Sequence, residues 1–436
     1  MKLELRITNY ELRLKFICIL LFALCSSLYA QRKETLVTLH HADSLIGKTL
    51  NGESVRELIG NVKLSQENVI VTCDKATEFL AKKYFLLEGN VKVKEDSVVF
   101  MGKRGTYSSE TKIAEGFDGV RLEEGKKNLV ATKGKYFSDE RKAFFEGNVI
   151  ANDTDVTLSA NEVTYYRNDK HLFAIGNVIL SNKSNSVKSY GERFENFPET
   201  KFSRLTGNPK VIEFDTTSDK TIDTLIVTAD TIESLQDSLE HLWAKKNVEI
   251  VRDSVSATSG FLEYVHAKDS IMLLEKPFVF YGEHQVRGDS IVLLLEKKGL
   301  RKAFIKNRAM AISKADSSEQ NRFNQLSGER MELFFEEKKL QRINVQRSAT
   351  SLYFLFDDDS VSGKKKPNGI NKASGDEVKI SFDNSKIEKI VVVGGVEGQY
   401  FPENLIKGKE EEFRLDGFQW IERKKVDSKE KSVGRK

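Results

Sequence analysis

The chain has 436 residues, of which 69 are basic and 65 acidic, so its formal charge is only +4. Charges of opposite sign alternate along the sequence, whereas a nucleic-acid-binding protein gathers its basic residues on one face, and the composition therefore argues against that class. The length allows two or three domains. The chain has only 5 prolines, and this low number argues against long proline-rich linkers between domains.

The first thirty residues have the layout of a secretory signal peptide. The apolar run FICILLFALCSSLYA ends at Ala30. This run is shorter than the roughly 18 to 20 residues that a bilayer-spanning helix needs, so we expect cleavage after Ala30 rather than an anchor. The mature chain, from Gln31 onward, is then expected outside the cytoplasm. Four basic residues precede the run: Lys2, Arg6, Arg13 and Lys15.

A short phrase, Gly-Asn-Val or a close variant, recurs along the chain. Its clear copies begin 29 residues apart, and a fixed period of roughly 20 to 50 residues is typical of a stacked repeat architecture. The clear copies are Gly60-Asn61-Val62, Gly89-Asn90-Val91, Asp118-Gly119-Val120, Gly147-Asn148-Val149 and Gly176-Asn177-Val178. Looser copies follow at Gly207-Asn208-Pro209, Lys246-Asn247-Val248 and Lys276-Pro277-Phe278.

Each period is predicted to hold three short strands. The first alternates apolar and polar residues, which places one face in a core and the other in water. The second starts with a small residue and has an apolar residue three places later, and the third returns to the next Gly-Asn-Val. Six periods share the spacing of the second strand: Ala160/Val163/Tyr165, Ala229/Ile232, Ser259/Leu262/Tyr264, Gly288/Ile291/Leu293, Gly328/Met331/Leu333 and Gly375/Val378/Ile380.

The recurring phrase is predicted to close one antiparallel layer of strands and to start the next. Glycine permits the backbone turn, asparagine tolerates a left-handed conformation, and valine is the first inward side chain of the new strand. A three-stranded layer cannot bury its apolar face alone, but stacked layers share one interior. The sequence therefore predicts an all-β fold.

These tandem copies, together with the segment HHADSLIGKTLNGESVRELIGNVKL at residues 40–64, resemble the OstA-like family. That family includes the periplasmic β-jellyroll proteins of lipopolysaccharide transport, of the LptA, LptC and LptD type. The resemblance covers most of residues 36–400. It implies an elongated, slightly open jellyroll, about 29 residues per repeat, whose groove shields the acyl chains of lipid A.

The resemblance also implies partners and a location. Such modules join end to end through their terminal strands, so LptC-like and LptD-like proteins, or further copies of the chain itself, are the expected protein partners. The expected ligand is lipopolysaccharide, and the expected location is the periplasm, with association with the outer membrane left open. No catalytic residue and no cofactor come with this family.

The predicted organisation has four parts. A signal peptide occupies residues 1–30, a first jellyroll block residues 31–215, a more divergent second block residues 216–400, and a charged tail residues 401–436. The tail is expected to be disordered or loosely docked, although Phe418 and Trp420 could form a docking motif or cap the last repeat.

Candidate ligand contacts are the inward positions of the first strands. Plain core packing is the alternative at each of them, since a closed interior would need the same residues. The predicted groove lining is Val62, Leu64, Val91, Val93, Val120, Leu122, Val149, Ala151, Val178 and Leu180.

The sequence offers no motif for catalysis and none for a metal site. There is no Gly-x-Ser-x-Gly elbow, glycine-rich phosphate loop or His-Glu-x-x-His. His40 and His41 are adjacent and would point to opposite faces of a strand. Cys73 is the only cysteine after the leader, which rules out an internal disulfide, and it occupies a small-residue position of its strand.

Two other functions stay open at this point. One is a structural or adhesive β-solenoid at the cell surface with a filled core. The other is a glycan-binding module, which would need exposed aromatic side chains. Tyr107, Tyr136, Tyr165 and Tyr264 end the second strands, and the sequence does not decide whether they face inward.

Overall fold

The computed structural model describes residues 36–422 except 185, 217–221, 253–254, 297–298, 317–320, 338, 359–364 and 384–385. The predicted signal peptide and residues 423–436 lie outside the described residues. The described strands form one antiparallel sheet of 29 strands, which confirms the all-β prediction. Helical segments among the described residues are short: η1 (Leu80–Lys82), η2 (His266–Lys268), α2 (Glu403–Ile406) and η3 (Glu410–Phe413).

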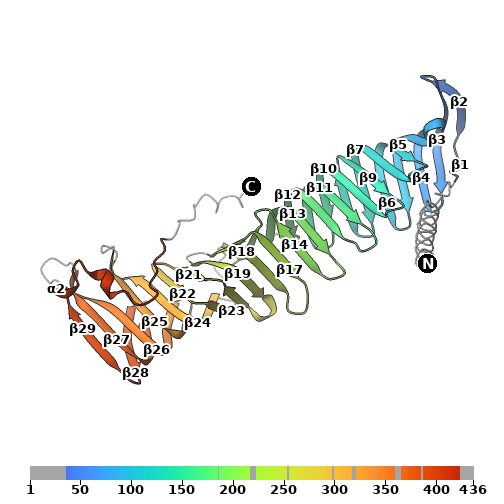
Figure 1. The fold of residues 1–436 in the computed structure, drawn as a ribbon. Helices are drawn as coiled ribbons and strands as arrows, with labels where there is room; N and C mark the ends of the chain where they lie inside the picture. The colour runs from blue at the N-terminus through green and yellow to red at the C-terminus, as the bar shows by residue number, and fades with distance from the viewer. Residues whose placement is uncertain are drawn as a thin grey trace, which may run out of the picture. The chain divides into compact units, whose positions relative to one another are not determined.

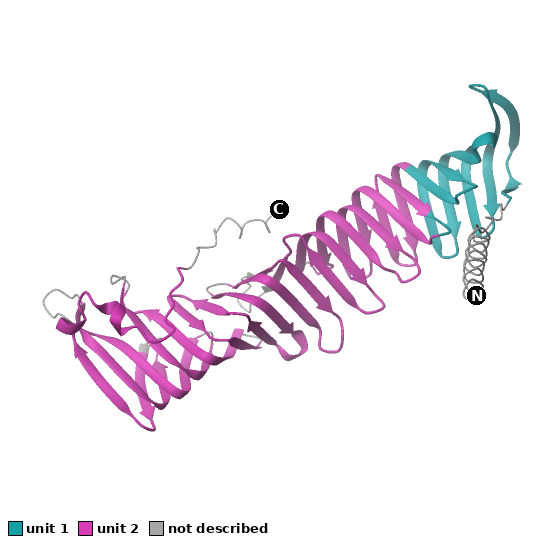
Figure 2. Ribbon diagram, in the orientation of Figure 1, with its two compact units in different colours: residues 1–116, 137–139 teal, residues 117–136, 140–436 magenta. Residues whose placement is uncertain are grey.

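The chain divides into two compact units (Figure 2). Unit 1 contains the described residues up to Gly116, together with Phe137–Asp139. Consecutive strands pair in chain order from β2 to β6, and β1 pairs with β3. The strands are β1 (Thr38–His41), β2 (Ser44–Leu50), β3 (Glu53–Gln66), β4 (Val69–Phe79), β5 (Tyr84–Glu95), β6 (Val98–Ser108) and the start of β7 (Ile113–Glu124).

Unit 2 contains residues 117–136 and 140–436. Successive long strands again lie side by side (Figure 1). Its first strands after β7 are β8 (Lys127–Ala131), β9 (Lys133–Phe137), β10 (Lys142–Asn152), β11 (Val156–Tyr166), β12 (Leu172–Asn182), β13 (Val187–Phe197), β14 (Phe202–Thr206), β15 (Lys210–Thr216), β16 (Ile222–Thr228) and β17 (Thr231–Leu235). The others are β18 (His241–Arg252), β19 (Val255–Val265), β20 (Ser270–Leu274), β21 (Phe278–Tyr281), β22 (His284–Arg287), β23 (Ser290–Glu296), β24 (Gly299–Lys314), β25 (Phe323–Glu336), β26 (Lys339–Asp358), β27 (Lys365–Asp383), β28 (Lys386–Val393) and β29 (Glu397–Pro402).

The Gly-Asn-Val phrase bends a strand and does not end it. In β3, Gly60 and Asn61 have φ values of 78° and 48°, and the pairing with β4 shifts between Ile59 and Val62. Two left-handed residues in succession make a bulge that turns the strand's direction while the strand continues. We call this pair of residues the corner. The prediction that each copy closes a layer of strands was therefore wrong, although the predicted left-handed glycine and asparagine are confirmed.

Corners recur at the same place in later strands. The register shifts in β5 between Glu88 and Val91, and in β10 between Glu146 and Val149. The predicted third strand of one period and first strand of the next are thus two halves of one strand. The chain reverses instead at polar turns, such as Glu67–Asn68 between β3 and β4.

The bend gives unit 1 two walls. We call the segment of β3 or β5 before its corner, with its partners in β4 and β6, the first wall. The segments after the corner form the second wall. Buried residues alternate along both halves: in β5, Phe85 and Leu87 precede the corner, and Val91 and Val93 follow it. Both walls therefore turn an apolar face toward a shared interior.

The small residue predicted at the start of each second strand lies beside the corner, where the walls converge. A Cβ added at Gly328 would lie 2.5 Å from Cγ1 of Val345, and one added at Gly288 would lie 2.5 Å from Cγ2 of Ile305. A side chain would therefore conflict with the neighbouring strand at these two glycines, and the equivalent positions of the other periods hold only small residues, such as Ala160 and Ser259.

Unit 2 has a continuous apolar cluster running from Val227 to Ile380. This cluster occupies one face of its bent strands, since Ala309 and Leu326 belong to it while their neighbours Met310 and Gln325 face the other side. The predicted block boundary at residues 215 and 216 stays a prediction.

The segment after β29 is packed, unlike the loosely docked tail that its charged composition predicts. Ile406 is fully buried against Leu352, Phe354 and Ile370. Farther along, Phe418 and Trp420 pack against a second small cluster made of Met310, Ile312 and Phe323. This segment, residues 403–421, covers the face of β24–β27 that points away from the main core.

Candidate functional site

The predicted groove lining lies on the inner face of the second wall or its equivalent in unit 2. Eight of the ten residues are at most 4% exposed, whereas Ala151 and Leu180 are half-buried. Each pair occupies the first and third positions after a corner, so both side chains point the same way. Their inward direction agrees with the prediction, but burial alone fits core packing as well as ligand contact.

The opposite wall supplies the larger side chains, which the prediction missed. In unit 1, Phe85 and Leu87 are 3% and 0% exposed, and in unit 2 Phe145 is 0% exposed. Their sequence signal was present in the segments that return to each Gly-Asn-Val, such as Lys142-Ala143-Phe144-Phe145. These larger side chains are therefore buried on the inner side of the fold, as are the valines after each corner.

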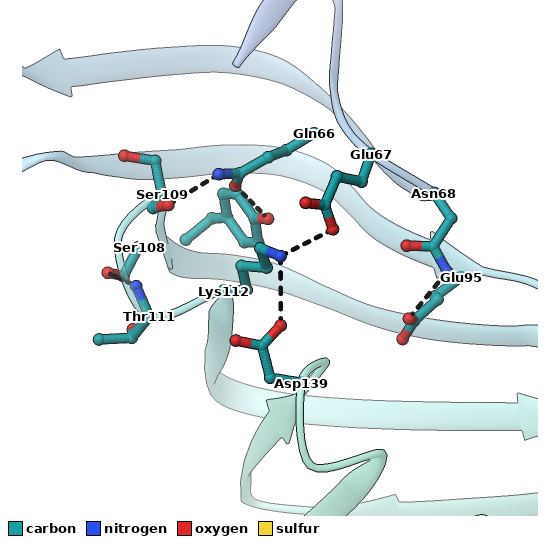
Figure 3. A network of polar contacts seen from close by, with 10 residues as sticks. Gln66, Glu67, Asn68, Glu95, Ser108, Ser109, Thr111, Lys112 and Asp139 are labelled. Atoms are coloured by element: carbon teal, nitrogen blue, oxygen red, sulfur yellow. Dashed lines mark hydrogen bonds and ion pairs between the residues drawn. The ribbon is translucent and has the colours of Figure 1, made fainter. Parts of the chain in front are cut away.

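The rim of the interior, opposite the corners, is joined by polar contacts in unit 1 (Figure 3). The Tyr107 hydroxyl donates a hydrogen bond of 2.8 Å to Oε1 of Gln66, and Nε2 of Gln66 donates one of 2.8 Å to the carbonyl of Ser109. Tyr107 pairs with Phe85 in the first wall, whereas Gln66 ends the second-wall half of β3. Both side chains are at most 2% exposed. These bonds therefore join the two walls.

Lys112 adds an ion-pair bridge at the same rim (Figure 3). Its Nζ lies 2.7 Å from Oε2 of Glu67, in the turn that ends the second wall, and 3.2 Å from Oδ1 of Asp139. The hydrogen bond to Glu67 is the main cause that raises the pKa of Lys112 above its ordinary value, against the opposing effect of burial. We call Gln66, Glu67, Tyr107 and Lys112 the rim clasp.

A related contact occurs in unit 2. The hydroxyl of Tyr165 donates a 2.8 Å hydrogen bond to Oε2 of Glu124. Tyr165 and Glu124 are separated by 41 residues, the same separation as Tyr107 and Gln66. Nearby, Nη1 of Arg167 donates a 2.6 Å hydrogen bond to the hydroxyl of Tyr136. The repeat thus places the same kind of contact at successive positions.

Three of the four tyrosines that end second strands face inward. Tyr107, Tyr136 and Tyr165 are 1%, 0% and 8% exposed, whereas Tyr264 is half-buried. Burial is the main cause that raises the pKa of Tyr107 and of Tyr165, so both hydroxyls stay protonated and able to donate. Their rings do not form the exposed aromatic row that a glycan-binding surface would need.

The interior offers little for catalysis. Cys73 is 4% exposed, and burial raises its pKa to about 12, so its thiol is protonated at neutral pH. No cluster of His, Cys, Asp or Glu among the described residues could hold a metal ion. His40 and His41 contact Ser65 and Asp43, respectively. Within the described part of the chain, no helix is both long and apolar enough to cross a membrane.

Exposed apolar strands occur in each unit. In unit 1, every residue of β2 is exposed, including Leu45 and Ile46 at 53% and 45%. In unit 2, β28 exposes Ile390 and Val393 at 40% and 45%. Among the pairings of the described residues, β2 and β28 each bond to one neighbouring strand, β3 and β27. Their other edges therefore carry backbone groups that can pair with another sheet.

These features define a class: an antiparallel protein of bent, stacked strands whose two walls enclose an apolar interior. Residues 34–190 match a family described as OstA-like protein. The predicted resemblance to the OstA-like proteins is thereby confirmed over this segment.

Two further comparisons concern the whole chain. No curated protein matches it. Among solved structures, it is similar to LptH of Pseudomonas aeruginosa, described as the LptA-homologous periplasmic component of the conserved lipopolysaccharide transport device. The identity is 11%, the match covers 34% of this chain and 82% of LptH, and the TM-score is 0.18.

Proposed function

We propose that this protein is a periplasmic component of lipopolysaccharide transport that shields lipid A acyl chains between its two walls. The observation that carries the proposal is the apolar inner face repeated in successive bent strands, in a chain whose residues 34–190 match the OstA-like family. The protein acts as a carrier and not as an enzyme, and it needs no cofactor. The basic and apolar leader supports export to the periplasm.

Energetics favour such an interior as a shield. Burying one methylene is worth about 0.8 kcal/mol, so an acyl chain of about a dozen carbons gains on the order of 10 kcal/mol. The valines after the corners are at most 4% exposed, so an acyl chain reaches them only after the walls part. A rim hydrogen bond contributes about 1 kcal/mol, and an exposed ion pair less than about 1 kcal/mol. Acyl burial can therefore offset opening of the rim.

The exposed edges support the proposed protein partners. An incoming strand can add to β2 or to β28 by backbone hydrogen bonds, while side chains such as Leu45 and Ile390 supply apolar contact. We propose that LptC-like and LptD-like jellyrolls, or a second copy of this chain, pair at these edges. Such pairing would make the protein part of a bridge between the inner and outer membranes.

A structural or adhesive β-solenoid is the second candidate. The nearly complete burial of Val62, Val93 and Val149, at 1%, 1% and 0% exposed, favours it, because a filled core needs no ligand. Glycan binding has weaker support, since Tyr107, Tyr136 and Tyr165 face inward.

Photo-crosslinking in living cells distinguishes the two candidates. A photoreactive amino acid replaces Val93, which faces the interior, or Leu122, the equivalent residue one period later. The matched controls are Lys92 and Arg121, which precede them on the same strands and are exposed. Transport predicts crosslinks to lipopolysaccharide from the interior positions, at least about tenfold above the controls. Equal or absent labelling would favour the structural candidate.

Depletion of the protein gives an independent test. Lipopolysaccharide should accumulate at the inner membrane if the protein is part of the transport path. A surface adhesin would leave its distribution between the two membranes unchanged.

A further inference from the structure

The rim clasp of unit 1 connects two turns that are far apart in the sequence. Gln66 and Glu67 lie at the turn between β3 and β4, and Tyr107 and Lys112 lie at or next to the turn between β6 and β7. Their hydrogen bonds and ion pair come from side chains (Figure 3). At the corner, in contrast, the two walls are joined covalently by the continuous strand.

This difference makes the rim the side of unit 1 that can open. Side-chain bonds can break and re-form with water, whereas the strand backbone at the corner cannot separate. Opening at the rim would turn the walls about the corners and would leave the pairing of β3 with β4 and of β5 with β6 intact on each wall. In unit 1, the corners would thus act as the hinge, and the rim on the opposite side of the interior would open.

We propose that the rim of unit 1 is a side entrance for fatty chains and that Gln66, Tyr107 and Lys112 are its gating residues. The inference rests on the proposed transport function and adds the route of loading. A fatty chain enters sideways between the turns at Glu67–Asn68 and Ser109–Lys112, and the clasp closes behind it. The polar head group stays outside, next to Lys112.

The chemistry of the clasp fits a gate better than a permanent seal. Gln66 and Tyr107 are nearly fully buried, and an aliphatic pair would fill the same space without needing hydrogen bonds. Polar groups, in contrast, can bond to water when the rim opens, which lowers the barrier to opening. Lys112, at 16% side-chain exposure, can exchange Glu67 for an anionic group of the ligand.

Locking the rim tests the route. In the full chain with its three native cysteines replaced by serine or alanine, Asn68→Cys and Glu110→Cys place one exposed thiol on each turn and leave the four residues of the rim clasp unchanged. A short bis-maleimide then joins the turns covalently. The probe is purified lipopolysaccharide, and its capture is read from a photoreactive residue at Val93. Each single-cysteine variant, treated with the same reagent, controls for modification alone.

The outcomes separate the route from the function. With both thiols outside the rim clasp, the proposal predicts that locking lowers capture at least about tenfold relative to the same double-cysteine protein without reagent and to the treated single-cysteine variants. Equal capture by the locked protein would overturn the side entrance and leave transport standing, because the ligand would then enter at an end. Absence of capture in every sample, including the unmodified chain, would overturn both.

A second variant tests the gating role without a crosslink. Tyr107→Phe keeps the ring but leaves the buried Gln66 amide without its Tyr107 partner, which destabilises the closed rim, so loading and release of lipopolysaccharide should both become about two- to tenfold faster. Tyr84→Phe is the matched control, since the Tyr84 ring stacks on Phe79 with centroids 4.7 Å apart and lies outside the clasp. A purely structural tyrosine would lower thermal stability without changing the rates, and that result would refute gating.

Discussion

The corner at Gly89 provides a direct test of the bent-strand architecture. Gly89 has a φ of 74°, and a Cβ added there would lie 2.2 Å from Oδ2 of Asp74 on β4. Asp74 also accepts a 3.0 Å hydrogen bond from Nδ2 of Asn90, the second residue of the corner. The substitution Gly89→Ala therefore introduces both backbone strain and a steric conflict.

The expected cost is the sum of two effects. A left-handed conformation costs an L-residue about 1 to 2 kcal/mol. Moving the Asp74 side chain away from the new methyl breaks its exposed hydrogen bond with Asn90, which adds about 1 kcal/mol. Gly89→Ala should therefore lower the free energy of unfolding by about 2 to 3 kcal/mol.

Cys73 is a suitable reporter for this measurement, because it lies next to Asp74 on β4 and is buried. With Cys18 and Cys25 replaced by serine, alkylation of Cys73 at increasing urea concentrations measures opening of the strands around the corner. The same titration in an Asp74→Gly background removes the side chain that conflicts with the new methyl. There Gly89→Ala should cost only the backbone strain, about 1 to 2 kcal/mol.

The double-mutant cycle thus predicts a coupling of about 1 kcal/mol between positions 74 and 89. A coupling near zero would show that the new methyl does not meet Asp74. An unchanged urea midpoint for Gly89→Ala would refute the left-handed corner itself, and with it the bent strand.

Three further predictions concern single side chains. Burial raises the pKa of Cys73 from 9.0 to about 12. At pH 8, the thiol of the folded protein should therefore be alkylated about 1000-fold more slowly than that of the urea-unfolded chain. Comparable rates would contradict the burial of Cys73. Burial alone would raise the pKa of Glu233, but Lys245 and Arg204 outweigh it and lower the pKa below 4.5. The ion pairs of Glu233 therefore stabilise the fold fully above pH 4.5, and this stabilisation is lost as the pH falls through the lowered pKa. Glu233→Gln should flatten the acid side of the profile of unfolding free energy against pH, measured by urea titration. An unchanged slope would contradict the pairing of Glu233 with Lys245 and Arg204. Ile406→Ala should lower the free energy of unfolding by about 2 to 4 kcal/mol and speed proteolysis of the C-terminal segment. The control Leu405→Ala should change neither quantity, because Leu405 is 54% exposed. Equal effects of the two substitutions would contradict the packing of Ile406.

The sequence predicted those parts of the fold that depend on local residue chemistry. The alternation of apolar and polar residues predicted the strands. The pair Gly89-Asn90 predicted two residues in the left-handed conformation, because few other residue types tolerate a positive φ. The small residue beside each corner also followed from the pattern, as at Gly328 on the strand next to the corner of β24. What the pattern could not decide was whether the left-handed pair reverses the chain or only bends it, since glycine and asparagine suit both.

The rim clasp could not be predicted from local pattern, because its partners are separated by 41 residues. Contact between Tyr107 and Gln66 requires a particular number of strands between the two turns, and it requires the bend that brings the walls together. A signal was nevertheless present. Tyr107, Tyr136 and Tyr165 recur every 29 residues, as would be expected of side chains that hold the same place in successive repeats.

The C-terminal segment shows how composition can conceal packing. Charged residues dominate it, yet Ile406 and Trp420 are spaced to reach two separate apolar clusters. The bidentate ion pair between Arg322 and Glu403, with distances of 2.9 and 2.6 Å, anchors its start. Near its end, the Ile421 amide donates a 3.2 Å hydrogen bond to Oε1 of Gln285.

The apolar sequence of the strands beneath residues 403–421 explains why this segment packs on them. The run Leu352-Tyr353-Phe354-Leu355-Phe356 is apolar at every position, which is typical of a strand buried on both faces. One face of β24–β27 meets the main core of unit 2, so the other face requires a cover, and residues 403–421 supply it. Because that outer face is already occupied, a partner sheet at this end of unit 2 would find its free apolar surface on β28, at Ile390 and Val393.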